Sequence, residues 1–183
     1  TMLQQYQNMI EDFAQELRFA APPTVELNEL QQLAKEMILG LVDSTQATEK
    51  LGILIGRGGT GKSTSIGAAE YELEQLFGRG CVMKLATTGK AATVIGGSTV
   101  HSPKYGLGVP VSEKEIKKLS GKTLQRLQER LKGVKLIVID EYSMLRAREL
   151  FFIDQILRRW ATLSNSTEDL LCCWLVIQPR FPL

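Results

Sequence analysis

The hydrophobic positions along the chain switch several times between a helical and a strand-like spacing. Apolar residues recur every three or four positions in residues 1–21, which predicts a first helix that packs through one side. They are Leu3, Tyr6, Ile10, Phe13 and Leu17. A second helix is predicted over 28–41, with Asn28 as its N-cap. Short apolar runs at 51–55, 81–86 and 134–139 then alternate with helical segments at 62–77, 90–95 and 112–131.

This alternation of strands and helices predicts an α/β fold. Strands separated by helices of this length pair in parallel, and the helices cover both faces of the sheet. The run 134–139 is apolar except for Lys135 and is continuous rather than alternating, which is the pattern of a strand buried on both faces. We therefore expect a mostly parallel sheet flanked by helices.

The composition is that of an ordinary globular protein. The 183 residues, 44% hydrophobic and 23% charged, suffice for one domain or a piece of one and are too few for two full cores. No run approaches the ~18 apolar residues of a membrane span. The first twenty residues contain Glu11, Asp12 and Glu16, where a signal peptide would be apolar. We therefore expect no membrane partner.

The cysteines and the histidine argue against two kinds of site. His101 is the single histidine, and Cys81, Cys172 and Cys173 include no CxxC pair, so a zinc site built from cysteine and histidine is excluded. An odd number of cysteines, two of them adjacent, suits free thiols in a reducing compartment. The sequence thus predicts an intracellular chain without a disulfide-linked partner.

The net charge of +2 is distributed unevenly along the chain. Residues 1–50 hold three basic and eight acidic side chains, whereas 112–135 hold eight basic and three acidic ones. A basic helix of this kind either forms a solvated face or attracts the phosphate backbone of a nucleic acid. Charge alone does not decide between the two.

A phosphate-binding motif lies between a predicted strand and a predicted helix. Residues 56–63 read GRGGTGKS, which fits G-x-x-x-x-G-K-[ST], and the flanking elements disfavour a chance glycine-rich turn. In this motif backbone N–H groups surround the phosphates, Lys62 reaches the terminal phosphates and Ser63 coordinates Mg²⁺. The predicted nucleotide-binding residues here are Gly58, Gly59, Thr60, Gly61, Lys62, Ser63 and Thr64.

A pair of carboxylates follows the predicted strand 134–139. Asp140 and Glu141 supply the acidic anchor that Mg²⁺ needs and the base that the attacking water needs. We predict hydrolysis of ATP with Mg²⁺, in which Ser63 and Asp140 hold the metal and Lys62, Asp140 and Glu141 are catalytic. The adjacent acids argue against small GTPases and nucleotide kinases, and no Asn-Lys-x-Asp segment is present to read guanine.

Four motifs follow one another as they do in a known helicase family. They are Leu27-Asn28-x-x-Gln31-x-x-Ala34, GGTGKS, TTGKAATVIGGSTVHS at 87–102 and DEYSML at 140–145. Over about residues 25–160 the chain resembles the first RecA-like domain of the Pif/RecD-type superfamily 1B ATP-dependent DNA helicases. The GG-x-T-x-HS element makes this resemblance specific, because it is rarely seen elsewhere.

The resemblance implies a 5′–3′ DNA helicase that moves on single-stranded DNA, with roles in DNA repair, recombination and telomere or genome maintenance. It implies that Gln31 contacts the adenine. It also implies that single-stranded DNA is bound by Thr88, Gly89, Lys90, Ser98, Thr99 and His101. A threonine-rich loop at a helix N-terminus does offer hydroxyl and N–H groups to phosphates. For His101 a purely structural role is the alternative. Nuclear and mitochondrial locations both fit the family.

The last residues depart from the family pattern. Family members follow the DE-x-SM helix with a strand that ends in G-D-x-x-Q-L-P-P, whereas this chain ends in CCWLVIQPRFPL. Read one frame over, the codons of this tail permit a hydrophobic strand followed by G-D-P-A-Q-I-P-P, so a frameshift is our hypothesis. The chain then divides into a helix and linker at 1–23, a RecA-like ATPase domain at 24–169 and a divergent tail at 170–183.

This tail has two expected consequences. The second RecA-like domain of the family supplies catalytic arginines and half of the DNA groove, and it is expected but absent here, so the chain alone is expected not to unwind DNA. A foreign tail in place of a central strand is also expected to leave a sheet edge unpaired and to promote aggregation.

Two alternative functions remain open at this point. Besides the helicase, the chain could be a non-catalytic fragment that binds nucleotide or DNA without turnover. The second alternative is another P-loop ATPase, such as an AAA-type machine. An unchanged activity after Lys62→Ala would favour the fragment. Stimulation of ATP hydrolysis by single-stranded DNA would favour the helicase, because an AAA-type enzyme does not require it.

Overall fold

The computed structural model describes residues 26–43, 51–110, 121–163 and 173–179. The helix predicted over 1–21 lies outside these ranges, and so do residues 112–120 of the charged region. Within the described ranges, no helix is long and apolar enough to cross a membrane.

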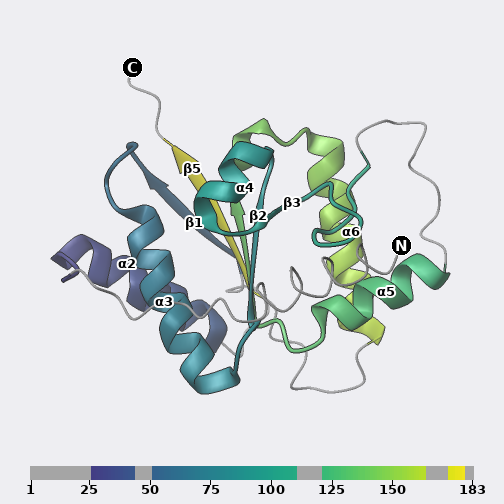
Figure 1. Ribbon diagram of the computed structural model, residues 1–183, viewed down its shortest axis with the longest axis horizontal. Coiled ribbons are helices and arrows are strands. Elements are labelled where there is room, and N and C mark those ends of the chain that lie inside the picture. The colour runs from purple at the N-terminus through teal and green to yellow at the C-terminus, as the bar shows by residue number, and fades with distance from the viewer. Residues whose placement is uncertain (1–25, 44–50, 111–120, 164–172, 180–183) are drawn as a thin grey trace, which may run out of the picture.

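The strands form a five-stranded parallel sheet in the order β1-β5-β4-β2-β3 (Figure 1). Their bounds are Leu51–Gly56 for β1, Val82–Ala86 for β2, Ser98–Thr99 for β3, Leu136–Asp140 for β4 and Cys173–Pro179 for β5. The predicted parallel sheet is therefore confirmed. The short β3 and the position of β5 are additions that the hydrophobic pattern did not predict.

Helices cover both faces of this sheet. They are α2 (Glu29–Asp43), α3 (Lys62–Phe77), α4 (Gly89–Ile95), α5 (Gly121–Leu131), the 3-10 turn η3 (Tyr142–Met144) and α6 (Ala147–Leu163). Figure 1 shows α2 and α3 on one side of the sheet and α5 and α6 on the other. The helices predicted at 28–41, 62–77 and 90–95 are confirmed within two residues at either end.

The centre of the core is β4. Leu136 and Val138 pack against one face of the sheet with α2 and α3, and Ile137 and Ile139 pack against the other face with α5 and α6. All four side chains are at most 1% exposed, so β4 is buried on both faces as its continuous apolar run predicts. Full burial of such side chains stabilises the fold by about 1.5–3 kcal/mol each.

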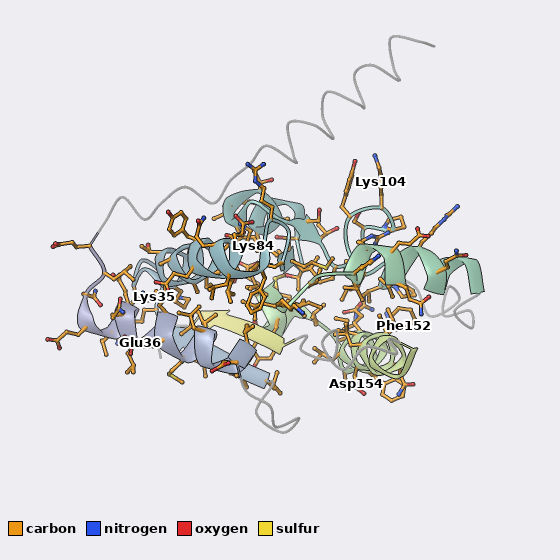
Figure 2. All side chains as sticks on the ribbon, turned by 90° about the horizontal axis from the view of Figure 1, so that it is seen from below. Lys35, Glu36, Lys84, Lys104, Phe152 and Asp154 are labelled. Carbon is orange, nitrogen blue, oxygen red and sulfur yellow. The ribbon has the colours of Figure 1, made fainter. Side chains whose placement is uncertain are left out.

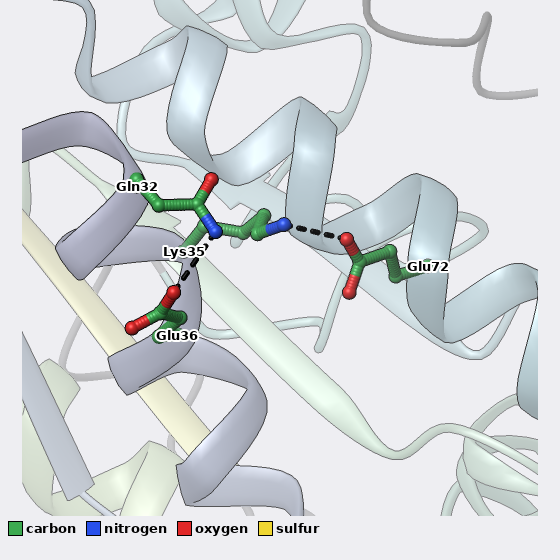
Figure 3. Close-up of polar contacts among 4 residues, drawn as sticks. All are labelled: Gln32, Lys35, Glu36 and Glu72. Carbon is green, nitrogen blue, oxygen red and sulfur yellow. Dashed lines mark hydrogen bonds and ion pairs between the residues drawn. The ribbon is translucent and has the colours of Figure 1, made fainter. Parts of the chain in front are cut away.

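Two ion pairs attach α3 to its neighbours. Lys35 of α2 contacts Glu72 of α3 at 2.6 Å, beside a Gln32–Glu36 hydrogen bond of 2.9 Å within α2 (Figure 3). Lys84 of β2 contacts Glu70 of α3 at 2.8 Å, and the two side chains are 21% and 11% exposed. Because this second pair is largely out of water, leaving either partner alone would be strongly destabilising.

Cys81 is a buried free thiol at the start of the second strand region. Burial, followed by the negative charge of Glu74, raises the pKa of this thiol to about 11. The thiol is therefore protonated at neutral pH, and Cys81 acts as a small packing residue rather than a nucleophile. Cys172 lies outside the described residues.

The tail does not leave its place in the sheet unpaired, so that expectation was wrong. Strand β5 runs between β1 and β4 and pairs in parallel with both. Residues 174–177 read WLVI, and aromatic and β-branched residues of this kind favour a strand whatever motif follows them. The outer strand on this side is instead β1, which among the described residues pairs with β5 alone.

This edge strand carries a row of exposed apolar side chains. Leu51, Ile53 and Ile55 are 59%, 54% and 50% exposed, and they alternate with the half-buried residues of β1. A long apolar edge strand is a template for pairing with another chain. Aggregation is thus expected to begin at β1.

We predict that Ile53→Lys raises the fraction of monomer, because a charge on an edge strand opposes strand pairing. Size-exclusion chromatography with light scattering after incubation at high concentration measures this fraction. Val94→Lys is the matched control, since Val94 is an apolar residue 73% exposed on α4. Equal monomer fractions for the two variants would contradict a role for the β1 edge.

Candidate functional site

The glycine-rich loop connects β1 to α3 in a conformation that few residues adopt. Gly59 and Gly61 have φ angles of 76° and 83°, in the left-handed region where a side chain is strained. The Thr60 hydroxyl donates a hydrogen bond of 2.9 Å to the carbonyl of Arg57 and closes the turn. The loop opens directly into the N-terminus of α3, so backbone N–H groups and the helix dipole point to the same place.

Lys62 is held against the loop by two hydrogen bonds. Its ammonium group donates to the carbonyl of Gly56 at 2.8 Å and to that of Arg57 at 2.9 Å. A phosphate in the loop would offer the ammonium group charged acceptors in place of these neutral carbonyls, and such bonds are stronger. Ser63 is exposed and Thr64 half-buried in the first turn of α3.

Gln31 joins the second helix to the same loop. Its side chain and that of Asn28 form a reciprocal cap at the start of α2, with bonds of 3.1 and 2.9 Å. The Gln31 amide also donates to the carbonyl of Thr60 at 3.3 Å. A Cβ atom at Gly61 would overlap the Gln31 amide, so the glycine is needed for this contact as well as for its φ angle.

A cleft of about 990 Å³ lies between α2, β1 and the glycine-rich loop. Apolar side chains of α2 line one part of it, among them Leu30, Leu33 and Met37, and the loop with Lys62 lines another. Asp140 and Glu141 do not line this cleft. The cleft thus offers an apolar surface beside a phosphate-binding loop, a combination that suits a nucleotide base next to its phosphates.

The two acidic residues stand at the carboxyl end of β4. Asp140 is the last residue of β4, and its Oδ1 accepts a hydrogen bond of 2.9 Å from the N–H of Glu141. Glu141 has a φ angle of 54° and is the only non-glycine residue with a positive φ in the described ranges. Strained backbone of this kind persists mainly at functional sites, which singles out Glu141 independently of its motif.

The donor atoms of Ser63 and of the carboxyl end of β4 fit Mg²⁺. Mg²⁺ prefers oxygen ligands and keeps several of its waters. Ser63 offers an exposed hydroxyl, and Asp140 retains a carboxylate oxygen besides the one that accepts the Glu141 N–H. One hydroxyl and one carboxylate, completed by waters and phosphates, form a suitable set.

The first predicted DNA segment is the N-terminus of α4. The Thr88 hydroxyl accepts a hydrogen bond of 3.2 Å from the N–H of Ala91 and caps the helix, while Gly89 and Lys90 are exposed. Thr87 precedes this cap, and its hydroxyl is buried without a hydrogen-bond partner among the described residues. No sequence pattern distinguished Thr87 from its neighbour.

The second predicted DNA segment is β3 and the residues that follow it. Ser98 and Thr99 pair with the end of β2 and are half-buried. The Nδ1 atom of His101 lies 2.9 Å from the carbonyl of Val109. Because a carbonyl only accepts, Nδ1 carries the proton, and Nε2 is left to interact with a ligand.

The structure brings both sets of predicted residues to the same end of the sheet. All strands are parallel, so their carboxyl ends lie together at that end, which is where ligands bind in open α/β sheets. The nucleotide set stands at β1 and β4, and the DNA set stands at β2 and β3. β4 and β2 are neighbours, so the two sets adjoin.

Comparisons with known proteins identify the family of this chain. Residues 26–169 match the family model described as PIF1-like helicase. The ATP-dependent DNA helicase RRM3 of Saccharomyces cerevisiae is 34% identical over 105 residues, which are 57% of this chain and 14% of that protein. The ATP-dependent DNA helicase Pif1 of Psychrobacter is 35% identical over 113 residues, which are 61% of this chain and 16% of that protein.

Solved structures give the same result for the fold. The Pif1 helicase of Candida albicans has a TM-score of 0.63 and 25% identity, and the match covers 87% of this chain and 35% of that one. The Pif1 helicase of Bacteroides in complex with ADP-AlF3 and ssDNA has a TM-score of 0.56 and 25% identity, and the match covers 85% and 32%. The chain therefore spans a small part of its relatives, and it belongs to the PIF1-like helicase family.

Proposed function

We propose that this chain is the ATP- and DNA-binding front part of a helicase that couples ATP hydrolysis to movement on single-stranded DNA. The observation that carries the proposal is that the glycine-rich loop after β1 and the Asp140–Glu141 pair after β4 lie at the same carboxyl end of the sheet, separated by β5 alone. A related Pif1 helicase has been solved with ADP-AlF3 and ssDNA. Both ligands thus have a precedent within the family.

Each residue of the nucleotide site has a proposed task. The loop N–H groups of 58–64 and Lys62 bind the phosphates, and the apolar cleft beside Gln31 receives the adenine. Ser63 and Asp140 hold Mg²⁺, which when bound neutralises phosphate charge. Glu141 accepts a proton from the attacking water and orients it.

The DNA residues bind a strand without reading its sequence. The exposed N-terminus of α4 supplies N–H groups and the Lys90 charge to phosphates. Thr99 at the end of β3 and the Nε2 atom of His101 just after it contact the DNA. Ser98 and Thr88 lie in the same two segments, although the Thr88 hydroxyl also caps α4.

The proposal extends to the parts that this chain shares with longer relatives. The matches cover 14–16% of the length of the two relatives named above, which agrees with a second RecA-like domain that completes the DNA groove. By family likeness we propose 5′–3′ movement, roles in DNA repair, recombination and telomere or genome maintenance, and a place in the nucleus or mitochondrion.

The proposed domain division is 1–23, 24–169 and 170–183. The family match ends at residue 169, which supports a boundary there. We keep the frameshift as the explanation for the tail after that boundary.

We predict that the mature transcript, sequenced from the codon of Asp140 onward, reads through G-D-P-A-Q-I-P-P into a second domain. A transcript that encodes the tail as written, with no such motif in any frame, would reject the frameshift. The ATP-binding and DNA-binding proposals do not depend on this outcome.

We predict that Lys62→Ala weakens the binding of Mg-ATP to this chain by about tenfold or more, since charge-assisted bonds to phosphate are lost. Isothermal titration calorimetry measures the dissociation constant. Lys132→Ala removes an exposed lysine outside the site and is expected to leave ATP affinity unchanged. Equal affinities of the two variants would exclude the loop as the nucleotide site.

We predict that Lys90→Ala weakens the binding of single-stranded DNA of any sequence and lowers the slope of log K against log salt by about one, the value of one phosphate contact. Fluorescence anisotropy with a labelled oligo-dT at several salt concentrations gives both quantities. Lys132→Ala again serves as the charge-matched control. An unchanged slope for Lys90→Ala would remove Lys90 from the DNA contact.

A further inference from the structure

One arginine of the basic segment 112–135 is half-buried and bonds to backbone carbonyls of a neighbouring loop. Arg130, in the last turn of α5, donates from Nη1 to the carbonyl of Gly106 and from Nη2 to the carbonyl of Pro103, the latter at 2.8 Å. Partial burial lowers the pKa of its guanidinium, although arginine stays charged at neutral pH. Neither alternative from the charge pattern, a solvated face or a phosphate contact, describes this side chain.

The two carbonyls belong to a loop, residues 102–108, that closes on the DNA segment. The N–H groups of Gly106 and Gly108 donate to the carbonyl of Ser102 at 3.0 and 3.2 Å, and the N–H of Val109 donates to Val100 at 3.1 Å. A Cβ atom at Gly106 would overlap the carbonyl of Thr99. The loop therefore packs closely against the segment that contains Thr99 and His101.

The base of this loop is part of the hydrophobic core. Leu107 and Val109 pack with Val100 and with Leu127 and Leu131 of α5. Arg130 lies between the last two residues along the helix and reaches the loop carbonyls above this apolar contact. Helix α5 thus holds the loop by an apolar base and a polar clamp, whereas Lys104 near the loop tip extends away from the domain (Figure 2).

We propose that Arg130 is a positioning residue for single-stranded DNA binding, which it supports without touching the DNA. By fixing the carbonyls of Pro103 and Gly106, it holds the loop in the form that places the Val109 carbonyl beside His101 Nδ1. The imidazole then keeps its proton on Nδ1 and presents Nε2 to the DNA side. This inference rests on the proposed function, because it assigns a purpose to the DNA residues.

The clamp requires the shape of arginine and not its charge alone. A guanidinium group donates through two nitrogens in a fixed plane, whereas a lysine ammonium group is a single point. Arg130→Lys therefore keeps the charge and loses the fork. A residue that only attracted phosphates would tolerate this change, and a positioning residue would not.

The first test measures oligo-dT binding by fluorescence anisotropy for Arg130→Gln and Arg130→Lys. Both are expected to weaken binding by about tenfold, as for the loss of two hydrogen bonds from a charged group, with the slope of log K against log salt unchanged. Arg126→Gln, an exposed arginine on the same helix, is the charge control. Full binding by Arg130→Lys, or a slope lowered by about one in Arg130→Gln, would instead show a direct phosphate contact and overturn the proposal.

The second test follows His101, whose signals stand alone because the chain has a single histidine. Long-range ¹H–¹⁵N spectra of the free parent chain are expected to show an imidazole protonated on Nδ1. The same spectra of Arg130→Gln are expected to show a mixture of both tautomers. Mant-ATP binding, measured on the same samples, is expected to be unchanged and reports that the variants are folded. A His101 spectrum that Arg130→Gln leaves unaltered would overturn the proposal.

The two tests separate the inference from the function on which it rests. A parent chain that binds ATP but no oligo-dT would reject the DNA proposal, and the inference would fall with it. If the parent chain binds oligo-dT and both Arg130 variants bind it with the same affinity, the inference alone is rejected.

Discussion

The enclosure of β4 is the constraint on which the rest of the structure depends. Both of its faces are covered by apolar side chains, and both of its edges are paired, with β2 on one side and β5 on the other. A backbone in that position has no water to bond with, so its N–H and C=O groups must all be satisfied by the neighbouring strands. The parallel register that results aligns Asp140 with Ala86 of β2 and Ile177 of β5. The acidic pair therefore emerges level with the end of β2, whereas β5 continues to Pro179.

The same framework connects the glycine-rich loop to the residues predicted to bind DNA at the start of α4. Helix α3 begins at the glycine-rich loop, and Glu70 on it is paired with Lys84 of β2 at 2.8 Å. Three residues beyond Lys84, the chain enters Thr87 and the cap of α4. Helix α3 is thus joined to the strand that leads into the cap of α4 by a pair that is costly to break, since both charges are largely out of water.

How far the sequence predicts this structure varies from element to element. The bounds of α3 were predicted to the residue, because Gly61 and Gly78 stand at its two ends in left-handed or irregular conformations. Strand β3 was missed because two residues give no period to recognise. The roles of Gln31 and the DNA residues came from family likeness, and the geometry adds that Gln31 reaches Thr60 across 29 positions of sequence. Arg130 escaped notice because a side chain that bonds distant carbonyls leaves no local pattern.

The tail shows most clearly why fold and chemistry are separable in such a chain. A strand between β1 and β4 requires only residues that suit a buried sheet, and the WLVI run meets that requirement without any family motif. Register places the end of this strand beside Gly56, where the glycine-rich loop begins, and just beyond the residue paired with Asp140. The end of β5 therefore lies between the start of the glycine-rich loop and the Asp140–Glu141 pair. The sheet is thus completed by residues that favour a strand, and the chemistry of the family motif is not needed for the fold.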